Sequence, residues 1–246
     1  MLISLSPSDL IAFLQTWPSE GVILLMLLSC GVVLSLMARI FGALGLMIYI
    51  TLAVIIANLQ VHVATYFSFF HEPIALGTVV FSSTFIGTSV LTECYGRVQA
   101  QKAVWLSFVG VIILMIFMMI TLGFKPAPDF AQAHQAIQDL FVPIPALVTA
   151  SLIAYVVGQY NDIWIFSLLS NLTRGKLLWL RSFVSPLVGA FIDNLVFSVL
   201  AWMVFSPHPL PWNTVFFTYI LGTYILRIGM AFVSVPYIYL VRHMVR

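Results

Sequence analysis

Charged side chains are scarce in this sequence. They make up 7% of its 246 residues, against about 25% in an average soluble domain. Hydrophobic residues make up 62% and the mean hydropathy is +1.10, so a water-soluble globule could not bury this much apolar surface. The composition therefore excludes a soluble domain and predicts one membrane-embedded helical bundle, whose length is best counted in spans of about 20 residues.

Cysteine and the common catalytic motifs are also scarce or missing. The two cysteines, Cys30 and Cys94, stand in or beside apolar stretches, which favours packing over a disulfide framework or a metal or redox pair. The chain has no HExxH, no GxSxG and no glycine-rich phosphate loop, so we predict neither an enzyme nor a cofactor or metal. Its ten Lys and Arg form no basic stripe, which argues against a nucleic-acid partner.

Long hydrophobic runs dominate the chain and predict an all-α, polytopic transmembrane bundle of about seven spans. The runs cover residues 21–38, 45–69, 74–94, 103–123, 145–169, 182–205 and 214–240. Residues 8–18 are shorter and carry Trp17 and Pro18, which indicates an interfacial segment with an aromatic anchor. The amino terminus lacks a basic region and a cleavage pattern, so the first span is expected to remain in the mature protein.

The basic residues predict the orientation of these spans. Lys125 falls outside and Arg227 within a span if the amino terminus is external. The other eight then face the cytoplasm, where Lys and Arg are enriched: Arg39, Arg97, Lys102, Arg174, Lys176, Arg181, Arg242 and Arg246. We therefore predict an external amino terminus and a cytoplasmic carboxyl terminus.

The longest external connection, KPAPDFAQAHQAIQDLFVPIP, has prolines at both ends. Apolar residues recur inside it at helical spacing, at Phe130, Ala133, Ile137 and Phe141. This spacing predicts a short surface helix. No linker or low-complexity segment divides the chain, so residues 1–246 are predicted to form one domain.

Two adjacent spans share the frame G-x3-D-x3-F-S-x-L. Six residues recur 31 positions later, namely Ser151, Gly158, Asp162, Phe166, Ser167 and Leu169 as Ser182, Gly189, Asp193, Phe197, Ser198 and Leu200. Because consecutive spans run antiparallel, the match predicts two similar Asp-bearing faces in opposite senses, as in transporters built from inverted elements. The narrow alphabet of apolar helices leaves chance as the alternative.

Three charged residues fall deep inside predicted spans, away from their ends: Asp162, Asp193 and Arg227. A charge at the bilayer centre costs about 2.5–3.5 kcal/mol on insertion scales, so such residues are usually paired, solvated or functional. Tyr155, Gln159 and Asp162 share one side of their helix. We predict that the acids line a pathway; the alternative is a structural ion pair with Arg227.

Other polar residues are consistent with a contact to substrate and with a structural contact between helices. Asn58 lies on a stripe with Thr51, His62 and Thr65, and amides such as Asn58 and Gln159 often hydrogen-bond neighbouring helices. Glu93 stands near the predicted cytoplasmic boundary, where Arg97 one turn later could satisfy it.

Four blocks carry a resemblance to a known family. They are LTECYGRVQAQKAVWL, SLIAYVVGQYNDIWIFSLL, LRSFVSPLVGAFIDNLVF and TYILRIGMAFVSVPYIYLV. In order and content they make the chain, over residues 50–240, similar to the VUT family, the queuosine precursor transporters. The family's motif positions fall on Asn58, Glu93, Tyr95, Gly96, Ala100, Gln159, Asp162 and Asp193.

The chain departs from the family pattern at two places. Where members usually have a Thr-Asp pair it has Thr88 and Ser89, and where many have an intramembrane Lys it has Arg227. Both departures fall in blocks expected to touch substrate, so they bear on which deazaguanine is carried.

The resemblance implies a six-helix core over residues 43–246, with residues 1–42 as an added amino-terminal helix, in the bacterial inner membrane. It implies uptake of a 7-deazaguanine, such as 7-cyano-7-deazaguanine, 7-aminomethyl-7-deazaguanine or queuine, for queuosine salvage in transfer RNA. The alternatives are a substrate-binding membrane subunit of a vitamin uptake system and a structural membrane protein. Whether the chain pairs with a second copy as a homodimer is left open by the sequence.

The expected substrate contacts follow from the shape of the base. Asp162 or Asp193 would accept the ring N–H and exocyclic amine, and Arg227 would face the carbonyl, much as Arg reads guanine. Asn58, Gln159 and Glu93 complete the polar candidates, and Tyr155, Phe166 and Phe197 are the candidates for stacking.

Overall fold

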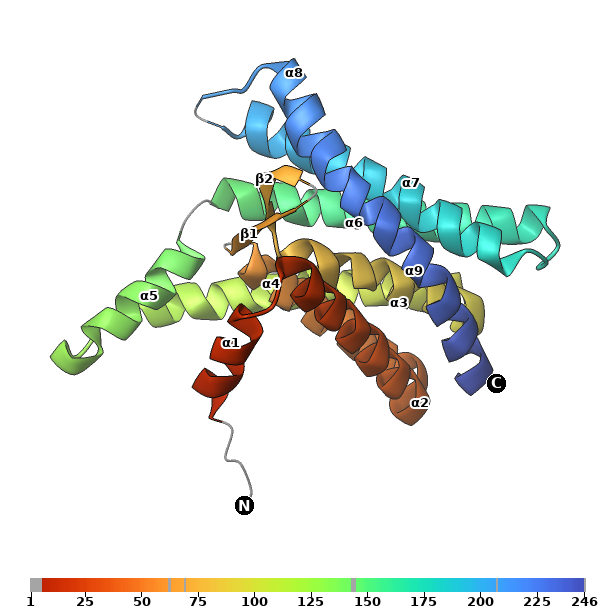
Figure 1. Ribbon diagram of the computed structural model, residues 1–246, viewed down its shortest axis with the longest axis horizontal. Coiled ribbons are helices and arrows are strands. Elements are labelled where there is room, and N and C mark those ends of the chain that lie inside the picture. Colours follow the sequence, from red (N-terminus) through yellow and green to blue (C-terminus); the bar gives the residue numbers. More distant parts are fainter. Residues whose placement is uncertain (1–5, 62, 69, 143–144, 207, 246) are drawn as a thin grey trace.

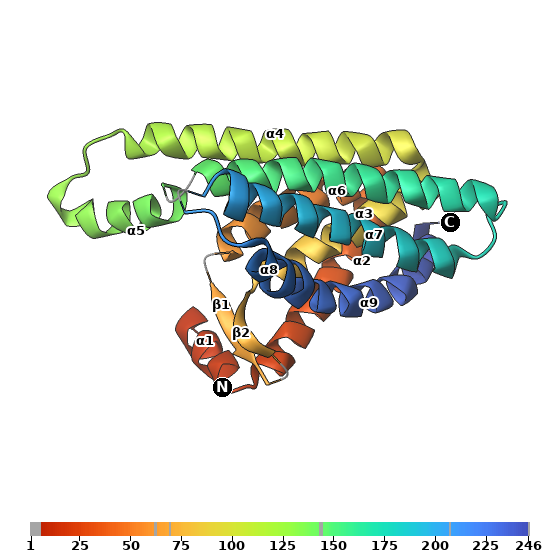
Figure 2. The same cartoon turned by 90° about the horizontal axis from the view of Figure 1, so that it is seen from above.

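A computed structural model describes residues 6–61, 63–68, 70–142, 145–206 and 208–245. The chain forms an elongated bundle of helices with one small β-hairpin at its side (Figures 1 and 2). In chain order the elements are α1 (Pro7–Gln15), α2 (Ser19–Gln60), β1 (Ala64–Phe67), β2 (Phe70–Ala75), α3 (Gly77–Tyr95), α4 (Arg97–Leu122), η1 (Pro128–Phe130), α5 (Ala131–Phe141), α6 (Pro145–Leu172), α7 (Leu178–Val199), η2 (Leu200–Val204), α8 (Trp212–Thr214), η3 (Val215–Leu221) and α9 (Gly222–Val245).

Helix α2 is a helical hairpin. Its 42 residues would extend about 63 Å if straight, roughly twice the hydrocarbon thickness. The backbone breaks at Gly42, where φ is 58° and ψ is −134°, a conformation that glycine adopts without steric cost. Gln60 Nε2 then lies 3.8 Å from Met26 Sδ, so the second arm returns along the first, as the separate runs 21–38 and 45–69 predict.

Within the described residues, four segments are long and apolar enough to cross a bilayer. They are Ser19–Gln60, Arg97–Leu122, Val148–Leu172 and Leu178–Val204. The exposed faces of these helices are apolar; Ile113, Ile116 and Phe117 on α4 are examples. This chain is therefore a multi-pass, predominantly helical membrane protein.

The predicted span 45–69 is wrong in its last part. Helix α2 ends at Gln60, and residues 64–75 form the antiparallel pair β1 and β2 instead. The turn of this hairpin is held by Glu20, whose Oε1 accepts hydrogen bonds from the amide and hydroxyl groups of Ser68, both at 2.7 Å. Pro73, which would break a helix, agrees with the strand. His62, which the predicted stripe included, lies outside the described residues, as does Arg246.

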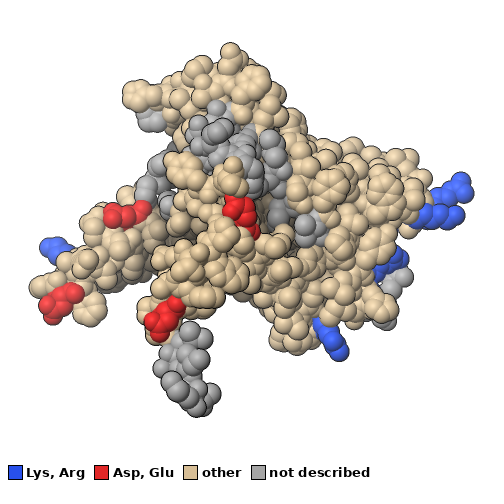
Figure 3. All heavy atoms as spheres, viewed as in Figure 1, with Lys and Arg blue, Asp and Glu red and all other residues tan. Residues whose placement is uncertain are grey.

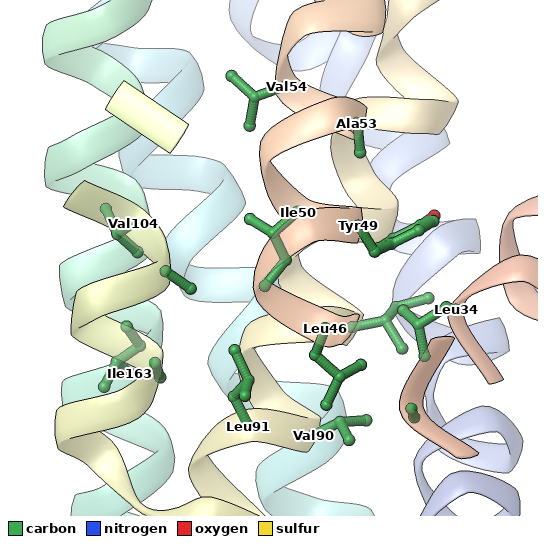
Figure 4. Close-up of a cluster of buried hydrophobic side chains, with 14 of the residues drawn as sticks. Leu34, Leu46, Tyr49, Ile50, Ala53, Val54, Val90, Leu91, Val104 and Ile163 are labelled. Atoms are coloured by element: carbon green, nitrogen blue, oxygen red, sulfur yellow. The ribbon is translucent and has the colours of Figure 1, made fainter. Parts of the chain in front are cut away.

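Helix α3 is the central element of the bundle. It lies against α2, α4, α6, α7 and α9, and from Gly77 to Leu91 nearly every residue is buried. Figure 4 shows part of the core around it, where Ile50 of α2, Leu91 of α3, Val104 of α4 and Ile163 of α6 lie together. Small side chains on α3 permit this close packing, because an added Cβ on Gly87 would lie 2.9 Å from Ile50.

The two ends of the bundle differ in charge. One end carries the β-hairpin, α1 and α5, and the other carries the α6–α7 turn and the carboxyl terminus (Figures 1 and 2). In Figure 3 the visible Lys and Arg gather mainly at the α6–α7 end and the visible Asp and Glu toward the other. Helix α5 confirms the surface helix predicted from the spacing of Phe130, Ala133, Ile137 and Phe141.

Two predicted helices contain π-helical turns. One, η2, continues α7, and the other, η3, leads into α9. In a π-helical turn each backbone hydrogen bond spans one residue more than in an α-helix, and such turns are frequent at functional sites. Here both lie against α7, where they border the cavity described below.

Candidate substrate-binding site

A cavity of about 470 Å³ lies between the helices, bordered by residues of α2 through α7, η2, η3 and α9. This is within the usual range of about 300–1,000 Å³ for small-molecule sites. Its wall includes the half-exposed residues Val61 and Leu140, so the cavity reaches the end of the bundle that carries α5 and the β-hairpin. Most of the wall is apolar, and the polar groups on it are few.

An ion pair lies in the wall of this cavity. Arg227 Nη1 of α9 lies 2.5 Å from Asp193 Oδ2 of α7, and the exposed fractions of the two side chains are 11% and 5%. Arg227 Nη1 also lies 3.4 Å from the carbonyl oxygen of Ala190, and the guanidinium stands 5.3 Å from the centre of the Phe81 ring. This is the ion pair that the structural alternative gives for one of the intramembrane acids, and here the pair borders the cavity.

Amide groups from two different helices border the cavity. Asn194 Nδ2 of α7 donates to Thr223 Oγ1 of α9 at 2.8 Å. Asn58 Nδ2 of α2 donates to the carbonyl oxygen of Val54, and Ser151 Oγ of α6 donates to Asn58 Oδ1 at 3.5 Å. These contacts leave hydrogen-bonding capacity on both amides, since each carries two N–H donors and an oxygen with two lone pairs.

Aromatic side chains supply much of the remaining wall. Trp202 of η2 and Tyr219 of η3 lie with ring centres 4.8 Å apart and planes tilted by 34°, and Phe197 borders the cavity from α7. Trp202 Nε1 and Arg227 Nε are buried without a hydrogen-bond partner among the described residues. A buried N–H group of this kind can donate a hydrogen bond to a polar molecule in the cavity.

Sequence reasoning did not predict Asn194, Trp202 or Tyr219 as site residues. Asn194 follows Asp193 directly and is an amide inside an apolar run, which was a usable signal. Trp202 and Tyr219 carry no such signal, because aromatic residues near span ends are typical of interfacial anchors. Their position depends on η2 and η3, which periodicity does not reveal.

The repeated frame of α6 and α7 forms a reciprocal contact. A Cβ added to Gly158 would lie 2.7 Å from Cβ of Asp193, and one added to Gly189 would lie 2.9 Å from Cβ of Asp162. Each would also lie near the other glycine's carbonyl oxygen, at 3.1 and 3.0 Å. The two frames therefore face each other with local two-fold character, as their antiparallel match predicts, and each glycine makes room for the other helix's aspartate.

Asp162 lies in a different environment from Asp193. It is fully buried and does not border the cavity. Its Oδ2 lies 3.1 Å from Thr88 Oγ1 of α3, which in turn lies 2.9 Å from Gln159 Oε1. Gln159 Nε2 donates to Thr84 Oγ1 at 2.7 Å. Gln159 and Asp162 thus face α3 in a buried polar cluster, apart from Asn58, Asp193 and Arg227.

The candidate stacking residues are separated as well. Phe197 borders the cavity. Tyr155 is buried behind Phe81, with ring centres 5.8 Å apart, and its hydroxyl lies 2.6 Å from Ser107 Oγ. Phe166 is buried under the Arg181 guanidinium, 5.5 Å from the ring centre.

Glu93 joins three helices at the α6–α7 end of the bundle. Its Oε2 lies 2.7 Å from Arg181 Nη2 of α7, and its Oε1 lies 3.4 Å from Arg242 Nε of α9. The alternative pairing with Arg97 is wrong, because Arg97 is exposed and Glu93 engages cations from other helices instead. This network joins α3, α7 and α9 at the end of the bundle opposite to the one that the cavity reaches.

The geometry suits binding of a small polar molecule. No three His, Cys, Asp or Glu side chains could hold a metal ion together within the part of the chain that the structure describes. The cavity offers a carboxylate, a guanidinium and two amides on an apolar and aromatic wall. Such a wall, with a few converging polar groups, is typical of small-molecule sites.

Comparisons with known proteins agree with this picture. No solved structure matches the chain. The chain is similar to a protein of Bacillus subtilis (strain 168) named "Probable queuosine precursor transporter", with 33% identity over 207 residues that cover 83% of this chain and 86% of the relative. The family model described as "Putative vitamin uptake transporter" matches residues 75–241, which include α3, α4, α6, α7 and α9. The chain therefore belongs to this family of vitamin uptake transporters.

Proposed function

We propose that this protein takes up a queuosine precursor, a 7-deazaguanine base, across the bacterial cytoplasmic membrane and that the base binds in the cavity beside Asp193 and Arg227. The observation that carries the proposal is the buried Asp193–Arg227 pair in the cavity wall, in a chain of this family. The name of the Bacillus subtilis relative supports the substrate class. Transport requires no covalent chemistry from the protein.

The donor edge of the base matches Asp193. A 7-deazaguanine presents a ring N–H next to an exocyclic amine, and a carboxylate offers about four lone-pair sites on its two oxygens. Arg227 engages Oδ2, so lone pairs on both oxygens remain for the two donors. The charge-assisted bond to Arg227 fixes the orientation of the Asp193 carboxylate.

The acceptor side of the base matches the donors that lack partners. Arg227 Nε and Trp202 Nε1 are buried without partners in the described chain, and both residues border the cavity. They suit the carbonyl oxygen of the base and the polar substituent at its 7-position. Asn58 and Asn194 supply further amide groups, and the Trp202–Tyr219 pair and Phe197 supply aromatic surface for the ring.

The proposed orientation places the cavity mouth outside the cell. The described basic residues of the α6–α7 end, with Arg39, would face the cytoplasm, as the positive-inside rule predicts. The two arms of α2, with α3, α4, α6, α7 and α9, would make seven spans. In this conformation the cavity reaches the external end, while Glu93, Arg181 and Arg242 close the cytoplasmic end.

The function is tested by salvage in bacteria that cannot make deazaguanines and lack their own transporter. Cells that express this protein should form queuosine in transfer RNA when given 7-cyano-7-deazaguanine, 7-aminomethyl-7-deazaguanine or queuine. Failure with all three bases, with the protein present in the membrane, would overturn the substrate class. Asp193→Asn should abolish salvage, because the amide replaces an acceptor oxygen with a donor.

A matched control distinguishes loss of the site from loss of a charge. Asp139 is an exposed carboxylate on α5 that accepts a hydrogen bond from Gln135. Asp139→Asn makes the same chemical change on an exposed side chain that does not border the cavity, and it should leave salvage at the wild-type level. Equal salvage by Asp193→Asn and Asp139→Asn would remove Asp193 from the binding site.

A further inference from the structure

The buried cluster of Thr84, Thr88, Gln159 and Asp162, here called the α3–α6 cluster, contains an acid without a counter-charge. Within the described residues, the other buried carboxylate, Asp193, has Arg227 as its cation, and the partly buried Glu93 has Arg181. Asp162 is fully buried, and its Oδ2 lies 3.1 Å from the hydroxyl oxygen of Thr88. An ionised carboxylate in such a place costs several kcal/mol, whereas a neutral carboxylic acid does not.

With Gln159 Oε1 facing Thr88, the hydrogen count in the cluster also favours another proton. Thr88 Oγ1 lies 2.9–3.2 Å from four acceptor atoms: Gln159 Oε1, Asp162 Oδ2 and the carbonyl oxygens of Thr84 and Phe85. A hydroxyl group has one hydrogen, so it cannot satisfy the contact with Asp162 and the contact with Gln159 together. A proton on Asp162 Oδ2 resolves this conflict, because the acid then donates to Thr88 and Thr88 donates to Gln159.

With that proton the hydrogen bonds run in one direction through the cluster. Asp162 donates to Thr88, Thr88 donates to Gln159 Oε1, Gln159 Nε2 donates to Thr84 Oγ1, and Thr84 donates to the carbonyl oxygen of Phe81 at 2.6 Å. The remaining oxygen, Asp162 Oδ1, is buried without a partner in the described chain, as is Ser185 Oγ of α7. A small rotation of Ser185 would let it donate to Oδ1.

The charged groups on the helices that pack against Asp162 do not offer an alternative partner. On α7, Asp193 and Arg181 are engaged with Arg227 and Glu93. On α3, Glu93 is the charged residue, and it holds Arg181 and Arg242. On α4, Arg97 and Lys102 are exposed.

The position of Asp162 links it to both the substrate site and the closed end. Asp162 and Asp193 occupy equivalent places at the α6–α7 crossing. Each aspartate packs against a glycine of the facing helix so closely that a Cβ added to that glycine would touch the Cβ of the aspartate. A shift of α7 against α6 therefore moves both acids. Opening the cytoplasmic end requires Glu93 of α3 to separate from Arg181 of α7, and these are the helices that carry Thr88 and Ser185 on either side of Asp162.

We propose that the α3–α6 cluster is a proton-binding site that couples uptake to a proton gradient. Asp162 binds a proton while the cytoplasmic end is closed and releases it to water when α3 and α7 separate at that end. The proton adds to a lone pair of Oδ2 and leaves as hydronium, so no other reactant is needed. The proposal rests on the transport function proposed above and adds the ion that drives it.

The test uses the purified full chain in proteoliposomes with labelled 7-cyano-7-deazaguanine. With the membrane potential clamped, an inward gradient of one pH unit should produce about tenfold accumulation if one proton moves with each base. Asp162→Asn should lose this accumulation but retain exchange of labelled for unlabelled base, which needs no net proton movement. Asp139→Asn, the exposed control, should behave as wild type.

The outcomes separate the two proposals. Absence of exchange in the wild-type protein with each deazaguanine overturns the transport function itself. Exchange without pH-driven accumulation, accumulation driven by a sodium gradient in place of a proton gradient, or accumulation by Asp162→Asn overturns the proton site and leaves the transport function standing.

A second measurement needs no variant and covers the case in which Asp162→Asn does not fold. Dicyclohexylcarbodiimide enters membranes and reacts with protonated carboxyl groups. In the wild-type protein, peptide mapping should find the adduct on Asp162 and not on the ion-paired Asp193, with slower labelling at alkaline pH. An unmodified Asp162, or equal labelling of both acids, contradicts the proposal.

Discussion

Replacement of Gly158 by alanine tests the helix crossing that organises the site. The new Cβ would lie 2.7 Å from Cβ of Asp193 and 3.1 Å from the carbonyl oxygen of Gly189, whereas carbon atoms in contact are normally about 3.5–4.0 Å apart. Neither neighbour is the end of a flexible side chain, so α6 and α7 must move apart by about 1 Å. Overpacking of this kind typically costs about 1–3 kcal/mol.

The assay is reversible unfolding in mixed detergent micelles, combined with uptake. We expect Gly158→Ala to lower the free energy of unfolding by about 1–3 kcal/mol and to reduce uptake, because Asp193 is displaced from Arg227. Gly229 of α9 is the control, since a Cβ there meets no atom within 4 Å. Gly229→Ala should be neutral or stabilising by up to about 1 kcal/mol, the difference in helix propensity. Equal stability of the two variants, or full uptake by Gly158→Ala, would refute the crossing as described.

Three further variants probe the cavity and the closed end. Arg227→Gln leaves Asp193 buried without a cation and should lower the free energy of unfolding by about 3–5 kcal/mol. Adding Asp193→Asn should recover most of that loss without restoring uptake. A double variant as unstable as Arg227→Gln would contradict the pairing. Trp202→Phe keeps the ring but removes the buried N–H, so the apparent affinity for the base should fall by about two- to tenfold; an unchanged half-saturating concentration in uptake assays would exclude this bond. Glu93→Gln weakens the contacts with Arg181 and Arg242 and should open the α6–α7 end of the bundle. The opening would be detected as faster maleimide labelling of Cys94 in a Cys30→Ser background. Labelling at the wild-type rate would show that the network does not hold this end closed.

The helices were predictable from the sequence because hydrocarbon thickness fixes the length of an apolar run. The break between the runs 21–38 and 45–69 corresponds to Gly42, and the spacing of Phe130 and Phe141 to α5. The hairpin of β1 and β2 was missed because Thr65, Tyr66 and Phe67 continue an apolar run, and short apolar runs do not distinguish strand from helix. The π-helical turns were missed because one extra residue per turn leaves hydrophobicity unchanged.

The residues of the cavity wall were only partly predictable. The cost of charge in a membrane selected Asp162, Asp193 and Arg227, and the structure brings the last two to the cavity with Asn58 and Phe197. Helical spacing correctly placed Tyr155, Gln159 and Asp162 on one face, but spacing does not say which neighbour that face meets. Here it meets Ser107 of α4 and Thr84 and Thr88 of α3, which depends on how the helices are arranged around α3.

The most direct measurement is saturation binding of labelled 7-cyano-7-deazaguanine, 7-aminomethyl-7-deazaguanine and queuine to the purified protein in detergent, for the wild type, Asp193→Asn and Asp139→Asn. We expect the wild type and Asp139→Asn to bind at least one base with the same dissociation constant. Asp193→Asn should bind that base at least a hundredfold more weakly, which is about 2.7 kcal/mol for the two hydrogen bonds to a charged group. Equal binding by all three proteins, or binding of none of the bases by a folded wild-type protein, would contradict this expectation.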